Sequence, residues 1–140
     1  MASNEPAVIR DLSQHPGVVA LVGFSLKPNR PSKDVAEYLV AHGVTVYPVN
    51  PMFAGQQGLG KTIVATLAEV PEHIHIVDIF RRAEDVPSVI DEAIAVKADA
   101  VWLQLGITNP EAERVAEDAG LLVVSDLCLK VEHARYAQRG

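Results

Sequence analysis

Cysteine is almost absent from this sequence of 140 residues, because Cys128 is its only one. A single cysteine excludes an intrachain disulfide and a cysteine-rich zinc site, and it suits a reducing compartment. No apolar run approaches the roughly 20 residues that span a bilayer, and residues 1–17 lack the apolar core of a signal peptide. We therefore expect a cytoplasmic protein with no membrane partner.

Basic residues are also few in this sequence. The chain has 12 Lys and Arg residues against 18 Asp and Glu residues, so its net charge is −6 at pH 7. Nucleic-acid phosphates attract clustered cations, and few of the cations here cluster. The charge therefore predicts no nucleic-acid partner, although a local group of cations can still bind a small anion.

The overall composition is that of a globular protein. Hydrophobic residues make up 49% of the chain and charged residues 21%, which argues against a disordered or fibrous protein. At this length one domain buries about two-thirds of the surface that the unfolded chain exposes. We expect a single domain over residues 1–140, with an ordered core from about 8 to 137 and a loose segment from 1 to about 7.

Short apolar segments alternate with amphipathic ones along the chain. Strands are predicted at residues 18–24, 44–49, 74–79, 100–105 and 121–124. Helices are predicted at 32–42, 62–69, 86–97 and 130–136, and one more opens with Asn109 as its N-cap and Pro110 at its first position. This alternation requires parallel strands joined by right-handed crossovers. We predict an α/β protein, a Rossmann-like three-layer α/β/α fold with a five-stranded parallel sheet in the order 3-2-1-4-5.

The segment that leaves the first strand is the first candidate site. In open parallel sheets, ligands bind beyond the carboxyl ends of the strands, where the strand order reverses. This segment contains Gly23, Ser25, Lys27, Arg30 and Ser32, the last as the expected N-cap of the next helix. Free backbone N–H groups, a helix N-terminus and two cations favour a phosphate group here. In the alternative interpretation the glycine only turns the chain, the serine only caps the helix, and both cations are solvated.

Two arginines follow the third strand on the same edge of the predicted sheet. Arg81 and Arg82 could contact phosphates or lie against an adenine ring. Alternatively, Asp85 caps the third helix and pairs with one of these arginines in solvent. The sequence favours neither interpretation.

A nucleotide-binding motif competes with this site. Residues 55–62 read GQQGLGKT and match G-x-x-x-x-G-K-[ST], with Lys61 and Thr62 in the positions that meet phosphates and Mg²⁺. The motif does not directly follow a strand, and the helix predicted after it is too short to support a triphosphate. A nucleotide hydrolase is therefore kept as an alternative. An NAD-binding redox module is another, although the signature G-x-G-x-x-G is absent.

Neither metal binding nor catalysis has a clear signal. His73 and His75 would share one face of a strand, but no third ligand is spaced with them, so we predict no metal site. No Ser-His-Asp or Cys-His set is selected by spacing or by a local motif. This pattern favours a binding module over a catalyst.

Six segments of the chain together resemble a known family. They read VALVGFSLKPNRPS, YPVNP, FAGQQGLG, VDIFRRAEDVP, WLQLGITNPEA and DLCLKVEHARY, and they cover residues 18–136. Their order resembles the small single-domain CoA-binding proteins, which are similar to the CoA-binding domain of the succinyl-CoA synthetase alpha subunit. With no catalytic set in view, the resemblance implies non-catalytic binding of coenzyme A or an acyl-CoA, and it makes the motif at 55–62 a coincidence. An acyl-CoA enzyme that works with a missing subunit is the catalytic alternative.

The resemblance also implies which residues meet the ligand. It places CoA over the first and second strand ends, with Lys27 and Arg30 as phosphate partners and the loop after the third strand close by. The implied cofactor-binding residues are Gly23, Phe24, Ser25, Lys27, Arg30, Ser32, Asn50, Pro51, Phe80, Arg81 and Arg82.

The tail departs from the family at one position. The family tail often reads Asp-Arg-Cys, whereas Leu127 stands here between Asp126 and Cys128, so any charge pairing by that arginine is lost. Cys128 is a candidate contact for the CoA thiol through a reversible mixed disulfide, and the alternative is a half-buried apolar residue. The sequence leaves the acyl group and the formation of a homodimer open.

Overall fold

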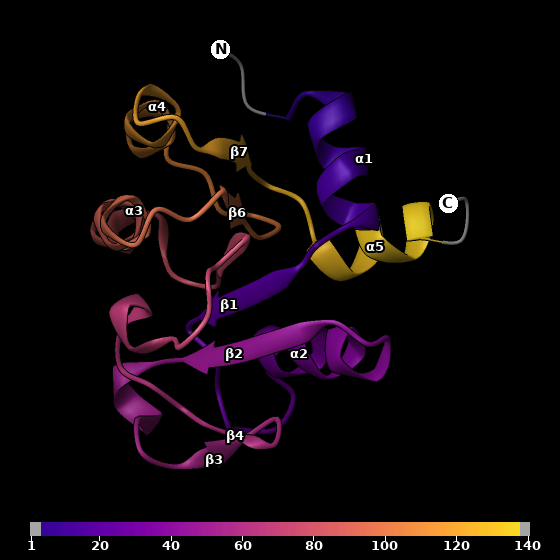
Figure 1. The fold of residues 1–140 in the computed structure, drawn as a ribbon, viewed down its shortest axis with the longest axis vertical. Helices are drawn as coiled ribbons and strands as arrows, with labels where there is room; N and C mark the ends of the chain where they lie inside the picture. The colour runs from indigo at the N-terminus through magenta and orange to yellow at the C-terminus, as the bar shows by residue number, and fades with distance from the viewer. Residues whose placement is uncertain (1–3, 138–140) are drawn as a thin grey trace.

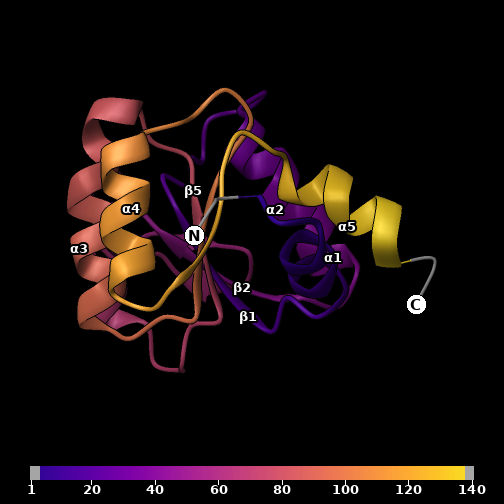
Figure 2. The ribbon, with the colours of Figure 1, turned by 90° about the horizontal axis from the view of Figure 1, so that it is seen from above.

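The computed structural model describes residues 4–137. Its main sheet contains five parallel strands, in the spatial order β2 (Thr45–Val49), β1 (Val18–Val22), β5 (Ile76–Ile79), β6 (Ala100–Leu103) and β7 (Leu122–Val124). Figures 1 and 2 show α3 (Val86–Ala95) and α4 (Pro110–Asp118) on one face and α1 (Pro6–Gln14), α2 (Pro31–Ala41) and α5 (Leu129–Ala137) on the other. The Rossmann-like three-layer fold is confirmed.

The strand order differs from the predicted 3-2-1-4-5 in the position of one strand. β5, the third strand of this sheet along the chain, pairs with β1 and β6, so the order is 2-1-3-4-5. β2 consequently lies at the edge, and Pro48 within it supplies the reason. Proline has no N–H for a second neighbouring strand, so it is tolerated in an edge strand. The Pro48 carbonyl faces outward and accepts a hydrogen bond from the Val64 N–H.

Helix starts agree with the sequence in one case and differ in another. Asn109 caps α4 as predicted, because its Oδ1 accepts a hydrogen bond from the Ala112 N–H at 3.1 Å. α2 begins one residue earlier than predicted, at Pro31, with Arg30 in the N-cap position. Ser32 is therefore not the cap that we predicted from the sequence.

Residues 62–69 do not form the predicted helix. β3 (Gln57–Gly58) and β4 (Lys61–Thr62) instead form an antiparallel hairpin. Its two turn residues, Leu59 and Gly60, have φ values of 57° and 73°, as a two-residue hairpin turn requires. Only a short 3₁₀ helix, η2 (Leu67–Glu69), follows before β5.

The start of the chain is more ordered than the sequence predicts. Residues 1–3 lie outside the described residues, but the expectation of a loose segment to about residue 7 is wrong for the rest. Asn4 exchanges two hydrogen bonds with Ser125, at 2.7 and 2.8 Å, and α1 begins at Pro6. α1 packs beside α5 in both views, and its Ile9 and Leu12 are buried (Figures 1 and 2).

Two apolar layers fill the space between the sheet and its helices. Trp102 and Phe24 are the largest fully buried side chains and lie in the layer below α1, α2 and α5. Val77 and Leu103 lie in the layer below α3 and α4. Strands buried on both faces explain the continuous apolar runs in the sequence. Within the described residues, no helix combines the length and apolarity needed to cross a bilayer.

Candidate functional site

A pocket of about 820 Å³ lies at the carboxyl ends of the strands, and we call it the switch-point pocket. In a sheet of order 2-1-3-4-5 the strand order reverses between β1 and β5, and ligands bind outside that point. The corrected strand order therefore keeps the site where the sequence predicted it. The pocket is lined by Gly23, Ser25, Lys27, Arg30, Pro31, Ser32, Val35, Asn50, Met52, Phe53, Phe80, Arg81, Arg82, Ala83, Gln104, Leu105, Gly106, Ile107 and Cys128.

The structure gathers most of the residues singled out in the sequence around this one pocket. They come from four segments far apart in the chain and comprise Gly23, Ser25, Lys27, Arg30, Ser32, Asn50, Phe80, Arg81, Arg82 and Cys128. Two predicted contacts do not line it. Phe24 is only 1% exposed, and its ring lies in the core beside Gly58 of the hairpin. Pro51 opens the short helix η1 (Pro51–Phe53), of which the two following residues reach the pocket.

The loop after β1 is braced by its own hydrogen bonds. The Ser25 N–H donates to Ser32 Oγ at 3.2 Å, and the Lys27 N–H donates to Ser25 Oγ at 3.1 Å. The Gly23 N–H donates to the Val49 carbonyl at 2.9 Å. These three amides are already engaged, which corrects the picture of a turn that offers all its N–H groups to an anion. The positive charge of this loop must come mainly from its side chains.

Four cations surround the pocket, and they are not equally available. Lys27 and Arg30 form no ion pair with any described residue. Arg81 and Arg82 lie 3.7 and 3.5 Å from Asp85 Oδ2, and Asp85 makes no side-chain capping bond to α3. The capping role considered for Asp85 is therefore not observed, whereas its ion pairing is. Lys27 and Arg30 carry the uncompensated charge.

Asn50 joins the loops after β1 and β2. Its Nδ2 donates to the Phe24 carbonyl at 2.8 Å, while its Oδ1 accepts from the Met52 N–H at 2.9 Å. Only 8% of the Asn50 surface is exposed. Its main role is therefore to hold the pocket wall in place, because both ends of its amide are already hydrogen-bonded. Phe24 thus contributes to the site through its backbone.

The far wall of the pocket comes from the loops after β6 and β7. The Gly106 N–H donates to Asp126 Oδ1 at 2.7 Å, and the Trp102 indole N–H donates to the Leu127 carbonyl at 2.8 Å. These bonds hold Cys128 beside the end of β6. Leu127 acts here through its carbonyl, which any residue type provides.

Residues 104–107, Gln104 to Ile107, were not predicted as part of the site. They line the pocket directly after β6, on the same sheet edge as the loops after β1 and β5. Their position directly after a buried strand could have identified them, because all parallel strands present their carboxyl ends at one edge of the sheet. Gln104 is the one polar side chain among these four residues, and it is 4% exposed.

A buried carboxyl lies next to Gln104. Asp78 Oδ1 accepts a hydrogen bond from Gln104 Nε2 at 2.5 Å, and no solvent reaches the aspartate side chain. Burial raises the pKa of Asp78 to about 7, and the bond from Gln104 opposes this only in part. At neutral pH both the ionised and the protonated forms are therefore populated.

The nucleotide-like motif at residues 55–62 lies outside the pocket. Its last two residues, Lys61 and Thr62, belong to a hairpin strand, and no α-helix lies between them and β5. The Lys61 ammonium lies 5.2 Å from the centre of the Tyr47 ring, and Gln57 Nε2 donates to Thr62 Oγ1. A phosphate-binding loop needs a strand, a glycine turn and a helix in succession. The motif lacks that context here.

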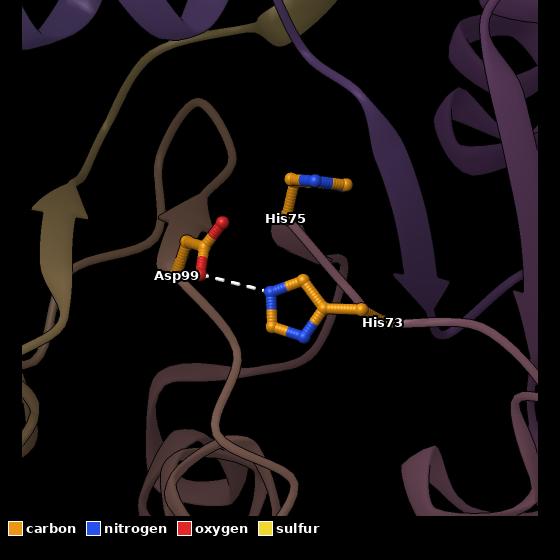
Figure 3. A group of neighbouring side chains, drawn as sticks. All are labelled: His73, His75 and Asp99. Atoms are coloured by element: carbon orange, nitrogen blue, oxygen red, sulfur yellow. Dashed lines mark hydrogen bonds and ion pairs between the residues drawn. The ribbon is translucent and has the colours of Figure 1, made fainter.

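A second cluster of titratable side chains lies at the opposite, amino-terminal edge of the sheet (Figure 3). His73, His75 and Asp99 place one potential ligand atom each within 4.8 Å of the others, so the structure adds the third group that the sequence did not show. His75 Nδ1 accepts the Val18 N–H at 2.9 Å, which leaves the ring proton on Nε2. A metal-bound histidine instead donates its other ring N–H. His75 is thus poorly prepared to bind a metal, and we assign none.

Fold and site together define a class of protein: a Rossmann-like α/β domain with a cation-lined pocket at its switch point. The chain belongs to the family described as CoA binding domain, whose model matches residues 17–134. It is 36% identical over 134 residues to the uncharacterized protein YneT of Bacillus subtilis (strain 168), with 96% of this chain and 98% of that protein covered. It is also 29% identical over 125 residues to an ADP-forming acetate–CoA ligase of Archaeoglobus fulgidus, of which it covers 18%.

Solved structures show the same relationship. A protein from Thermus thermophilus is 36% identical, with a TM-score of 0.85, over 97% of this chain and 99% of that one. A hypothetical protein from Pyrococcus horikoshii OT3 is 34% identical, with a TM-score of 0.87, over 97% and 99% of the two chains. Each of these two alignments covers nearly the whole of both proteins. The fold is therefore shared across this family at the level of the whole domain.

Proposed function

We propose that this protein binds coenzyme A or an acyl-CoA in the switch-point pocket without catalysing a reaction. One observation carries the proposal: two unpaired cations, Lys27 and Arg30, and two paired ones, Arg81 and Arg82, surround a single pocket in a chain of net charge −6. A cation group in an acidic protein marks a site for a small anionic ligand. Membership in the CoA binding domain family supports CoA as the ligand class.

The distribution of charge around the pocket fits a ligand with one charged end. The cations lie on the loops after β1 and β5, whereas the wall after β6 carries Leu105 and Ile107 and no charge. We place the phosphates of CoA at Lys27 and Arg30, the adenosine near Asn50 and Phe80, and the pantetheine arm toward Cys128. Arginine and aromatic groups at the loop after β5 suit an adenine ring.

The lack of a proton-transfer set in the pocket supports a binding role. Among the described residues, the pocket lining includes no histidine and no carboxylate side chain. General acid–base chemistry depends on such a group within hydrogen-bond reach of the ligand. The remaining titratable lining groups are cations and Cys128, which suit binding of a phosphorylated thiol or thioester.

Isothermal titration calorimetry with CoA, acetyl-CoA, NAD and ATP on the wild-type protein tests this function. We expect saturable binding of CoA and acetyl-CoA and at least about tenfold weaker binding of NAD and ATP, because neither competitor carries the pantetheine arm. A parallel assay for phosphate release from ATP with Mg²⁺ should give no signal above buffer. Stronger binding of ATP or NAD than of CoA would contradict the proposal.

A further inference from the structure

The buried carboxyl of Asp78 needs an explanation beyond the fold. It lies in the middle of β5, in register with Leu21 on β1 and Trp102 on β6, and is 0% exposed. Its Oδ2 has no hydrogen-bond partner among the described residues. Burying a carboxyl with a free oxygen is unfavourable, and an apolar residue of similar size would stabilise the core more. A functional role of this side chain would account for the cost.

The hydrogen bond of Asp78 leads directly to the pocket. Asp78 Oδ1 accepts from Gln104 Nε2, and Gln104 lines the pocket at the end of β6. No other side-chain hydrogen bond of Gln104 is formed with a described residue. Since the amide nitrogen is held by the aspartate, the amide oxygen Oε1 is left to accept a bond from a ligand. The nearly complete burial of Gln104 limits the water that could take that place.

We propose that Gln104 accepts a hydrogen bond from the pantetheine arm of CoA, and that Asp78 is the positioning residue that fixes the Gln104 amide in the required orientation. This inference rests on the proposed function. The pantetheine arm offers two amide N–H groups, a secondary hydroxyl and a thiol, all of which are hydrogen-bond donors. Apart from Gln104, the wall after β6 consists of Leu105, Gly106 and Ile107, so a donor on the arm meets a single side-chain acceptor there.

The chemistry of the pair agrees with this assignment. A carboxylate accepts hydrogen bonds only, so ionised Asp78 selects the orientation of Gln104 that turns Nε2 inward and Oε1 outward. A buried polar pair of this kind defines one orientation because the alternatives leave a polar atom unsatisfied. Asp78 itself does not line the pocket and acts on the ligand only through Gln104.

The test compares three ligands by calorimetry: CoA, desulfo-CoA, which lacks the thiol, and adenosine 3′,5′-bisphosphate, which lacks the whole arm. Gln104→Met should weaken CoA binding about tenfold, the loss of one ligand hydrogen bond, and leave adenosine 3′,5′-bisphosphate within about twofold. If the effect of Gln104→Met is undiminished with desulfo-CoA, the donor is an amide N–H or the hydroxyl of the arm. If the effect vanishes, the donor is the thiol. Gln57→Met, on the hairpin outside the pocket, is the matched control and should change none of the three.

A double-mutant cycle separates positioning from a merely structural role of Asp78. Asp78→Val should weaken CoA about tenfold in the wild type and have almost no further effect in the Gln104→Met background, because it acts through Gln104. Asp78→Asn keeps an acceptor for Nε2 and should restore affinity to within about threefold. Additive effects of the two changes, or equal weakening of adenosine 3′,5′-bisphosphate, would overturn the proposal.

The inference and the proposed function fail in different ways. If the wild type binds CoA and Gln104→Met binds it equally well, only the role of the pair is refuted. If the wild type binds none of the three ligands, the proposed function fails and the inference fails with it. Near-ultraviolet circular dichroism of each variant confirms that the compared proteins are folded.

Discussion

Gly23 and Phe80 lie in contact at the point where β1 and β5 end. Gly23 has a φ of 91°, and a Cβ at this position would overlap the Phe80 carbonyl oxygen. Both residues line the pocket, and the loops that follow them carry the four cations. A glycine at residue 23 therefore lets the two cation-bearing loops approach one another.

Replacement of Gly23 by alanine should destabilise the protein strongly. The new methyl group meets backbone rather than a movable side chain, and the positive φ adds strain, so we expect a loss of about 2–4 kcal/mol in the free energy of unfolding. Urea denaturation measures this loss. Gly43→Ala is the matched control: its φ is 83°, but nothing lies within 4 Å of the new Cβ, so we expect only about 1 kcal/mol. Equal losses for the two variants would contradict this account.

The phosphate assignment predicts a selective loss of affinity. Arg30→Ala and Lys27→Ala should each weaken CoA about tenfold and weaken dephospho-CoA, which lacks only the 3′-phosphate, less. Both cations form no ion pair with a described residue, and in the proposed complex they face the 3′-phosphorylated end of the ligand. Calorimetry with both ligands measures the difference. Arg82→Ala should have a smaller effect, since its guanidinium is already paired with Asp85.

Lys61→Ala is the matched control for these variants. Lys61 belongs to the hairpin outside the pocket, and its ammonium lies over the Tyr47 ring of β2. Affinity for CoA should therefore stay within about twofold. Equal losses of CoA and dephospho-CoA in the Arg30 and Lys27 variants would remove the assignment of these cations to the 3′-phosphate. Loss of binding in Lys61→Ala would move the site to the nucleotide-like motif.

Asp78 should make stability depend on pH. Burial raises its folded-state pKa to about 7, above the ordinary value near 4, so the native state holds a proton that the unfolded chain releases between these values. The contribution of Asp78 to the free energy of unfolding is therefore highest below about pH 4. This contribution falls as pH rises toward 7 and is constant at higher pH. A difference of three pKa units corresponds to about 4 kcal/mol as an upper bound.

Asp78→Asn isolates this contribution, because asparagine has nearly the same shape and does not titrate. The variant should be more stable than the wild type at pH 8 by about 1–4 kcal/mol and differ little at pH 4.5. Urea denaturation at both pH values measures the free energy of unfolding. A constant difference between the two proteins across this range would show that Asp78 titrates normally.

Cys128 should contribute to the pocket as a small apolar surface. It is partly buried, and its loop is held by the hydrogen bond from the Trp102 indole N–H to the Leu127 carbonyl. Cys128→Ala should therefore change the Kd for CoA by less than about threefold under reducing conditions. Intact mass spectrometry after incubation with CoA disulfide should show the unmodified wild-type mass. An adduct of CoA on the wild type that Cys128→Ala abolishes would establish a mixed disulfide and contradict this expectation.

Much of the fold could be predicted because parallel strands buried on both faces leave a strong apolar signal. The runs that include Val18–Val22 and Ala100–Leu103 needed no tertiary information. The order of the strands depends on which edges pair, and apolar runs do not encode that. Pro48 did hold a clue, since a proline within a strand indicates an edge.

The two mispredicted segments have local causes. α1 is only nine residues long, and a helix of that length is marginal in water without packing, which here comes from α5. At residues 62–69, the turn formed by Leu59 and Gly60 closes a hairpin that competes with a helix, and a leucine with positive φ is not a usual turn signal.

Candidate residues on the loops after β1 and β5 were predictable from the rule for parallel sheets. Gln104 was missed because its relevance depends on a contact with Asp78, 26 positions earlier in the chain. Side-chain pairs across neighbouring strands become visible only when the register is known, and here the predicted strand order placed β5 elsewhere.

A crystal structure of the protein soaked in CoA tests the central claim most directly. We predict that the phosphates lie within hydrogen-bond distance of Lys27 and Arg30, and that the pantetheine arm extends past Gln104 toward Cys128. An empty switch-point pocket, with the phosphates bound instead at residues 55–62, would contradict the account.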